Sequence, residues 1–177
     1  DYRAIAPELG TMADFDELVA QARSRGIGIV MDLVINHTSD EHEWFQKAMA
    51  GDPKYRDYYI IRKGEKGKLP NNWGNFFAVC PWTQIGDTDE YYLNLFDKKQ
   101  PDLNWENPKL RGKLVETIRF WLDKGLGGFR IDAITHIKKM EGLPSGPADG
   151  PDGMVGCFDY TRCIDGIGDF LTELREA

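Results

Sequence analysis

The sequence lacks the features that mark membrane-spanning, disulfide-stabilised and metal-clustered proteins. No apolar run approaches the roughly 18–20 residues that a transmembrane helix needs. No basic start followed by an apolar stretch marks a signal peptide. Cysteine is scarce, with three residues in 177, and their spacing matches no metal-binding pattern. Free thiols in a reducing compartment are the simplest interpretation, so we expect a cytoplasmic protein. We assign it no metal and no cofactor.

An excess of positive charge is also missing. The 22 Lys and Arg residues are outnumbered by 29 Asp and Glu residues, and the formal net charge is -7. Nucleic acids and anionic membranes both favour basic surfaces, so neither is expected as a partner. A neutral ligand suits this balance better. Hydrophobic residues make up 41% of the chain, which is ordinary for a globular protein.

The first part of the chain predicts a helix followed by a strand. A helix is expected over residues 11–25, with Thr11 as its cap and Gly26 just past its end. Its apolar stripe consists of Phe15, Leu18, Val19 and Ala22. The apolar, β-branched run at residues 27–35 predicts a strand that is covered on both faces, as in a parallel sheet.

The last part of the chain repeats this alternation. Asn107 can cap a second helix with Pro108 in its first turn, and Gly125 closes it. Its predicted buried stripe is Leu110, Leu114, Ile118, Trp121 and Leu122. A short strand follows at residues 127–132, and a third helix begins near Asp165. The apolar positions of that helix are Ile167, Phe170, Leu171 and Leu174. Helices alternating with strands are typical of a parallel α/β architecture.

The segment between these parts, residues 36–106, is too long for a simple connection. Structureless loops beyond about 12–15 residues are uncommon, so this insert should have its own small fold. Its tryptophans are expected to form a small core rather than sugar platforms; they are Trp44, Trp73, Trp82 and Trp105. Two strands are too few for a closed barrel or a good open sheet. The chain is therefore predicted to be a piece of a larger catalytic domain.

The run GFRID at residues 128–132 contains the first candidate site. Side chains alternate along a strand, so Arg130 and Asp132 should lie on one face at its carboxyl end. That end holds the active site in parallel α/β folds. The guanidinium favours an ionised carboxylate, as a nucleophile requires. A structural ion pair at a strand end is the alternative, and the spacing alone does not separate the two.

A second polar cluster, DLVINH at residues 32–37, ends the earlier strand. Asp32 and Asn36 share one face, and His37 stands at the turn. His37 and Asn36 could donate to sugar hydroxyls while Asp32 orients a neighbour. Taken alone, this cluster fits a loop anchor better than a binding site.

Together these motifs resemble the α-amylase superfamily of glycoside hydrolases. The run DLVINHTS at residues 32–39 resembles its first signature region, and GFRID at residues 128–132 resembles the second, whose Asp is the family nucleophile. The run QPDLNW at residues 100–105 is similar to a further region typical of the oligo-1,6-glucosidase and α-glucosidase branch. NNWGNFF at residues 71–77 also resembles that branch. The likeness covers essentially the whole chain, in the family's order.

The resemblance implies an α/β fold, namely part of a (β/α)8 TIM barrel with a small domain B after the third strand. Residues 1–35 would hold the second helix and third strand. Residues 36–106 would form domain B, and residues 107–177 the third helix, fourth strand and fourth helix. The partner that this chain needs is then the remainder of its own barrel.

The resemblance also assigns roles to individual residues. Asp132 would be the nucleophile and Arg130 its charge partner. His37 would bind the sugar in the subsite of the cleaved unit, with Asp32 holding the local network. Positions that line the pocket in the glucosidase branch match Phe77, Phe96 and Gln100. Aromatic faces suit the C–H groups of a pyranose, although a core role is the alternative for each Phe.

Two positions depart from the branch. His136 lies where α-amylases contact the leaving-group side of the glucan and where glucosidases often lack a His. Ala133 directly follows the nucleophile, where the branch commonly has Val or Thr, and this position is tied to linkage preference. Both departures bear on whether α-1,6 bonds are preferred.

The activity implied by the resemblance is retaining hydrolysis of terminal α-glucosidic bonds in short glucooligosaccharides. Such enzymes need two carboxyl groups about 5–5.5 Å apart. The family's acid/base is a Glu after the fifth strand, which this chain does not reach. Glu173 and Glu176 fall on the polar side of the last helix and are expected to be solvated. The 177-residue chain alone is therefore predicted to be inactive.

Several alternatives remain. Within enzymes they are a 1,4-preferring α-glucosidase, a trehalose-6-phosphate hydrolase, a sucrose isomerase and an α-amylase, although the QPDLNW motif argues against a plain α-amylase. Another is a non-catalytic relative that chaperones amino-acid transporters, and the retained Arg130, Asp132 and His37 argue against it. A sugar-binding module without chemistry does not account for a charged strand end.

Overall fold

The computed structural model describes residues 1–65, 67–77 and 79–176; Lys66, Ala78 and Ala177, the last residue of the third predicted segment, are outside these ranges. Its helices are α1 (Met12–Ser24), α2 (Glu43–Met49), α3 (Pro53–Arg56), α4 (Pro108–Asp123), the 3-10 turn η1 (Ile134–His136), α5 (Phe158–Thr161) and α6 (Ile167–Arg175). Its strands are β1 (Val30–Val34), β2 (Ile61–Lys63), β3 (Trp73–Gly74), β4 (Trp82–Gln84), β5 (Glu90–Leu93), β6 (Gly128–Asp132) and β7 (Val155–Gly156).

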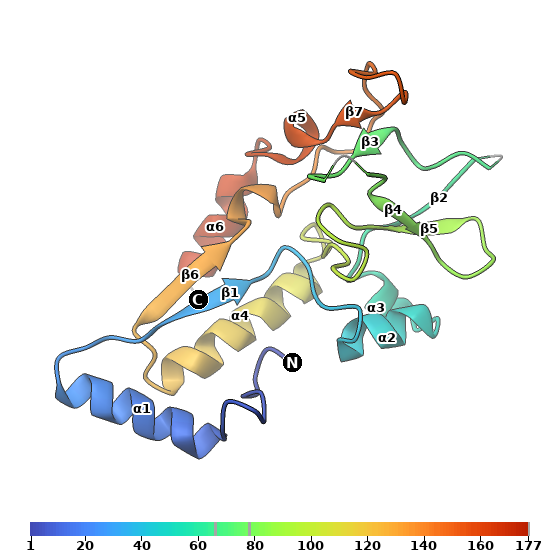
Figure 1. The fold of residues 1–177 in the computed structure, drawn as a ribbon. Coiled ribbons are helices and arrows are strands. Elements are labelled where there is room, and N and C mark those ends of the chain that lie inside the picture. The colour runs from blue at the N-terminus through green and yellow to red at the C-terminus, as the bar shows by residue number, and fades with distance from the viewer. Residues whose placement is uncertain (66, 78, 177) are drawn as a thin grey trace.

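Strands β1 and β6 form a parallel pair, as the alternation of helices and strands predicts (Figure 1). Asp32 on β1 is opposite Arg130 on β6, and Val34 is opposite Asp132. Apolar residues of both strands, α4 and α6 share one core cluster. The polar residues of the two motifs therefore meet at the same end of the strand pair.

The starts of the first two predicted helices are confirmed by their caps. The Thr11 hydroxyl accepts from the Asp14 backbone N–H, and the Asp14 carboxylate accepts from the Thr11 N–H, which is a capping box. The Asn107 side chain accepts from the backbone N–H of Lys109, and Pro108 occupies the first turn of α4. These local bonds satisfy N–H groups that the helix itself leaves unpaired.

The prediction that the strand at residues 27–35 is covered on both faces is wrong for this chain. Burial along β1 is uneven, and five positions expected in the core are 38–61% exposed: Leu18, Ile27, Val30, Leu122 and Leu171. Within the described residues β1 and β6 pair only with each other, and α4 and α6 pack against them. The other face of the pair and the flanks of the helices consequently lack packing partners.

Residues 36–106 contain a small sheet and core. β2, β5 and β4 pair antiparallel in that order. β3 pairs instead with β7, which lies beyond β6 in the chain. The associated buried cluster is Ile60, Trp73, Trp82, Leu93, Leu95, Leu143, Val155 and Cys157. Part of the chain after β6 thus completes a core that begins within the insert.

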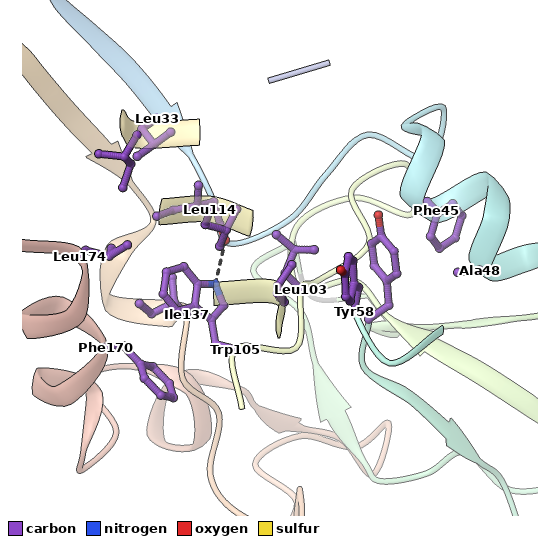
Figure 2. Close-up of a cluster of buried hydrophobic side chains, with 14 of the residues drawn as sticks. Leu33, Phe45, Ala48, Tyr58, Leu103, Trp105, Leu114, Ile137, Phe170 and Leu174 are labelled. Atoms are coloured by element: carbon purple, nitrogen blue, oxygen red, sulfur yellow. Dashed lines mark hydrogen bonds between the residues drawn. The ribbon is translucent and has the colours of Figure 1, made fainter. Parts of the chain in front are cut away.

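The tryptophans of the insert divide between two cores. Trp73 and Trp82 are buried in the cluster of the small sheet, as expected. Trp105 instead joins the core of β1, α4 and α6, where its indole N–H donates to the Ile35 carbonyl at 2.8 Å (Figure 2). Trp44 is half-buried beside Tyr58. The predicted single small core is therefore correct for only two of the four.

Candidate active site

Arg130 links the two carboxylates at the ends of the parallel strands. Its Nη1 lies 2.8 Å from Oδ1 of Asp32, and its Nη2 lies 2.7 Å from Oδ1 of Asp132. The predicted shared face of Arg130 and Asp132 is confirmed. The register of β1 against β6 explains why Asp32 joins this pair, because it is directly opposite Arg130.

This charged group is open to solvent in the chain. The side chains of Arg130, Asp32 and Asp132 are 63%, 52% and 38% exposed. Exposed ion pairs typically contribute about 0–1 kcal/mol, so stability alone is a weak reason for the arrangement. The hydrogen bond to Asp32, with the charges of both carboxylates, raises the pKa of Arg130. Within the described residues the second oxygen of Asp132 has no hydrogen-bond partner, so it is available for chemistry.

The backbone turns sharply after Asp132. Ala133 adopts a left-handed conformation with φ 50° and ψ 25°, and its carbonyl accepts from the His136 N–H at 2.9 Å. A non-glycine residue in this region stores about 1–3 kcal/mol of strain, and such strain clusters at functional sites. The turn begins η1 and fixes the direction in which the chain leaves the carboxylate.

His37 lies in a buried setting at the end of β1. Its side chain contacts Phe96, with ring centroids 5.3 Å apart, and its Nε2 is 3.0 Å from Nε2 of Gln100. Burial lowers the pKa of His37, an effect that the charge of Asp102 opposes, so the ring is neutral near pH 7. His37 and Gln100 line a cavity of about 390 Å³. This volume is within the range of small-molecule sites.

A buried ion pair lies behind His37. The Lys139 ammonium is 2.7 Å from Oδ2 of Asp102, and the two side chains are 4% and 0% exposed. Asn36 bonds to both, through Oδ1 to Lys139 and through Nδ2 to Asp102. Asp102 also accepts from the Leu95 N–H at 3.0 Å. The polar atoms of this network are satisfied, so it can hold the end of β1 rigidly.

Sequence reasoning missed Asp102 and Lys139 as parts of the site. Asp102 stands inside the QPDLNW motif, and that was the available signal. The sequence gives no such signal for Lys139. The adjacent Lys138 has the same charge, and it pairs near the surface with Glu106. Only the folded chain distinguishes the buried lysine from its neighbour.

Aromatic rings continue from His37 toward η1. Phe96 packs on Phe76 with centroids 4.7 Å apart, and Phe76 contacts His136 at the same separation. His136 also approaches the Thr161 hydroxyl at 3.3 Å, and burial lowers its pKa. The structure thus brings Phe96 and His136 together with His37.

Phe77 is not part of this group. Its side chain is 67% exposed, and among the described residues it has no ring contact with Phe96 or His136. Its backbone N–H donates to Oδ1 of Asn75 at 2.8 Å, which orients the loop. The neighbouring Phe76 lies between the rings of Phe96 and His136 instead. The sequence alone, with two adjacent Phe residues, does not tell which of them takes this position.

Neither Glu173 on α6 nor Glu176, just past its end, belongs to the site. Glu176 is exposed, and the Glu173 side chain is 41% exposed while its carboxylate pairs with Nε of Arg111 at 2.6 Å. Arg111 also lies over the Phe170 ring, 5.0 Å from its centroid. In the described part of the chain, no three His, Cys, Asp or Glu side chains cluster as metal ligands. No helix described is long and apolar enough to cross a bilayer.

Comparisons with known proteins agree with the motifs. The family described as "Alpha amylase, catalytic domain" matches residues 1–176. An oligo-1,6-glucosidase of Bacillus cereus is 55% identical over 177 residues, covering 99% of this chain and 32% of that protein. A probable oligo-1,6-glucosidase of Bacillus subtilis is 51% identical over 179 residues, with the same shares.

A solved structure has the same arrangement of backbone. The trehalose-6-phosphate hydrolase of Bacillus licheniformis superposes with a TM-score of 0.90 at 42% identity, covering 99% of this chain and 31% of that one. The chain spans about a third of the length of the curated relatives it matches. Such neighbours imply a TIM-barrel fold, of which β1, β6 and their helices are a part. The chain belongs to the alpha-amylase catalytic domain family.

Proposed function

We propose that the whole protein is a retaining α-glucosidase of the oligo-1,6-glucosidase type. The observation that carries the proposal is the carboxylate of Asp132, held on one oxygen by Arg130 and free on the other, at the carboxyl end of a parallel strand. Relatives named oligo-1,6-glucosidases, 51–55% identical across this chain, support the substrate class. The substrate is then a short α-linked glucooligosaccharide.

In this reaction Asp132 attacks the anomeric carbon of a terminal α-glucosyl unit. The bond to the leaving oxygen breaks, and a β-glucosyl ester forms. Water then cleaves the ester and releases α-glucose, so the configuration is retained. Arg130 keeps the carboxylate ionised and oriented while Asp32 holds the other side of the guanidinium. The proton for the leaving oxygen comes from the family's acid/base Glu, outside this chain.

The neighbouring residues bind the sugar. We assign His37 and Gln100 to its hydroxyl groups, because both line the same cavity. Phe96 presents an aromatic ring beside His37, and His136 extends the row on the leaving-group side. Phe77 remains a candidate contact only for a longer substrate, since it is exposed and outside the ring group.

The parts of the chain have matching roles in this proposal. Residues 36–106 form a small domain B that covers one side of the pocket, with β7 added to its edge. Residues 1–35 and 107–177 belong to the barrel. The free cysteines and the acidic charge favour a cytoplasmic enzyme with no nucleic-acid or membrane partner.

The nucleophile is tested in the full-length protein with p-nitrophenyl α-glucoside. Asp132→Asn should lower kcat/KM at least about a thousandfold, because the amide cannot form the ester. Asp87→Asn, in the exposed turn between β4 and β5, is the matched control and should keep wild-type activity. Near-wild-type turnover by Asp132→Asn would refute the assignment.

The substrate class is tested by a panel of isomaltose, maltose, sucrose, trehalose 6-phosphate and starch. The oligo-1,6-glucosidase type predicts fastest hydrolysis of isomaltose. Preference for trehalose 6-phosphate would place the protein with the hydrolases named among its relatives. The isolated 177-residue chain should cleave none of them, since its one candidate nucleophile has no acid/base partner.

A further inference from the structure

Two side-chain amides face the two ring nitrogens of His37. Nδ2 of Asn36 is 3.3 Å from Nδ1, and Nε2 of Gln100 is 3.0 Å from Nε2. A neutral imidazole has one N–H and one lone pair, so it can accept from only one amide. The other amide must turn its oxygen toward the ring. Which amide turns decides where the proton of His37 resides.

The orientation of Asn36 is fixed by groups that cannot exchange roles. The Lys139 ammonium only donates, and it lies 3.0 Å from Oδ1 of Asn36. The Asp102 carboxylate accepts from Nδ2 at 3.2 Å. Turning the amide over would set its NH2 group against the ammonium and its oxygen against the carboxylate, in a site where both side chains are buried. The Asn36 N–H must therefore point at Nδ1 of His37.

Gln100 has no such anchor. Within the described residues, the hydrogen bond of its side chain is the one to His37. Half a turn about its last side-chain bond places the amide oxygen where the nitrogen now lies, with no other bond lost. The weakly held amide follows the tautomer, and the strongly held one sets it.

We propose that Asn36 is a positioning residue that holds His37 in the tautomer with its proton on Nε2. The proposal rests on the assignment of His37 to the sugar pocket, and adds which atom of the ring donates. Nε2–H lies on the side of Gln100, which lines the cavity of about 390 Å³ with His37. A sugar hydroxyl that takes the place of Gln100 at this nitrogen then meets a donor, never an acceptor.

A donor at this position has a chemical consequence. A hydroxyl that accepts from His37 keeps its own proton, which it can donate to a carboxylate. The acid whose negative charge acts on His37 from β6 is Asp132. The proposal places one sugar hydroxyl between the histidine and this carboxylate. The opposite tautomer would take the hydroxyl proton and break this chain of bonds.

Neutron diffraction from crystals of the full-length enzyme, exchanged into D2O, tests the tautomer directly. We expect a deuteron on Nε2 of His37 and none on Nδ1. Asn36→Asp replaces the donor with an acceptor of the same shape, so Nδ1 should gain a deuteron. Gln100→Met is the control, and it should leave the wild-type tautomer unchanged. A deuteron on Nδ1 in the wild type, or a tautomer that changes with Gln100 rather than Asn36, would overturn the proposal.

Kinetics separate positioning from a general structural effect. Asn36→Asp should lower kcat/KM for p-nitrophenyl α-glucoside about tenfold, the value of one lost hydrogen bond. With glucosides that each lack one hydroxyl, this penalty should vanish for the analogue missing the partner of His37. An equal penalty on every analogue would contradict the positioning role. A wild-type enzyme that cleaves no α-glucoside would instead refute the proposed function, while the tautomer stays readable.

Discussion

Replacing Lys139 with Met isolates the contribution of the buried ion pair behind the site. The variant keeps an unbranched side chain, one atom shorter, but removes the ammonium that contacts Asp102 and Asn36. The Asp102 carboxylate is fully buried, so it then carries an uncompensated charge. Such a charge is costly in a medium of low polarity, and packing alone does not offset it.

The size of the effect follows from what Asp102 retains. Removing one partner of a buried ion pair costs about 3–5 kcal/mol. Asp102 still accepts from the Leu95 N–H at 3.0 Å and from Asn36 at 3.2 Å, which places the expectation near the lower limit. The relatives are about three times as long as this chain, so 1 kcal/mol corresponds to about 1 °C, and Lys139→Met should lower the melting temperature of the full-length protein by about 3 °C.

Calorimetry on the full-length protein provides the measurement, and the chain offers its own control. Lys138→Met removes the adjacent lysine, whose ion pair with Glu106 is partly exposed, and should cost about 1 kcal/mol or less. The double variant Asp102→Asn with Lys139→Met removes both charges, so it should be more stable than Lys139→Met alone. If Lys139→Met melted within about 1 °C of wild type, then leaving the Asp102 carboxylate buried without its partner would not cost the free energy of unfolding expected here.

Two further outcomes are expected in the full-length protein. Arg130→Lys should lower kcat at least about tenfold with little change in melting temperature. The reason is that one ammonium cannot replace a guanidinium that uses separate nitrogens for Asp32 and Asp132. An unchanged kcat would contradict the role of Arg130 in joining the two carboxylates. Burial lowers the pKa of His42 below its unfolded value of about 6.5, so the unfolded state binds a proton first and stability decreases as the pH is lowered through this region. His42→Asn keeps the cap of α2 without titrating, so its melting temperature should fall less than that of wild type between pH 7 and pH 4.5; parallel curves would exclude His42 as a source.

The elements that sequence predicts well are those stabilised by local bonds. Thr11 and Asn107 cap their helices through residues two or three positions away, so both starts can be read directly. The ion pair of Arg130 with Asp132 depends only on the alternation of one strand. Asp32 joins them because two parallel strands end together, which the alternation of elements also predicts.

Features set by distant contacts could not be predicted in this way. The ring of His42 packs against that of Tyr2, far earlier in the chain, with centroids 5.3 Å apart. Phe76 rather than Phe77 meets Phe96, although the two residues are chemically identical and adjacent. Each outcome depends on segments 20 or more residues away.

The charged residues of the site divide by burial, and the division matches what each group must do. Lys139 and Asp102 are buried, and with Asn36 they satisfy one another, so they can fix an orientation but cannot react. Arg130 and Asp132 are exposed, and one oxygen of Asp132 has no hydrogen-bond partner among the described residues, so this pair can react but gains little stability. A nucleophile needs the exposed setting, with an oxygen free to react. The sugar-binding residue beside it needs a fixed orientation, which the buried group provides. The buried group therefore supplies the rigidity that the reactive group cannot supply for itself.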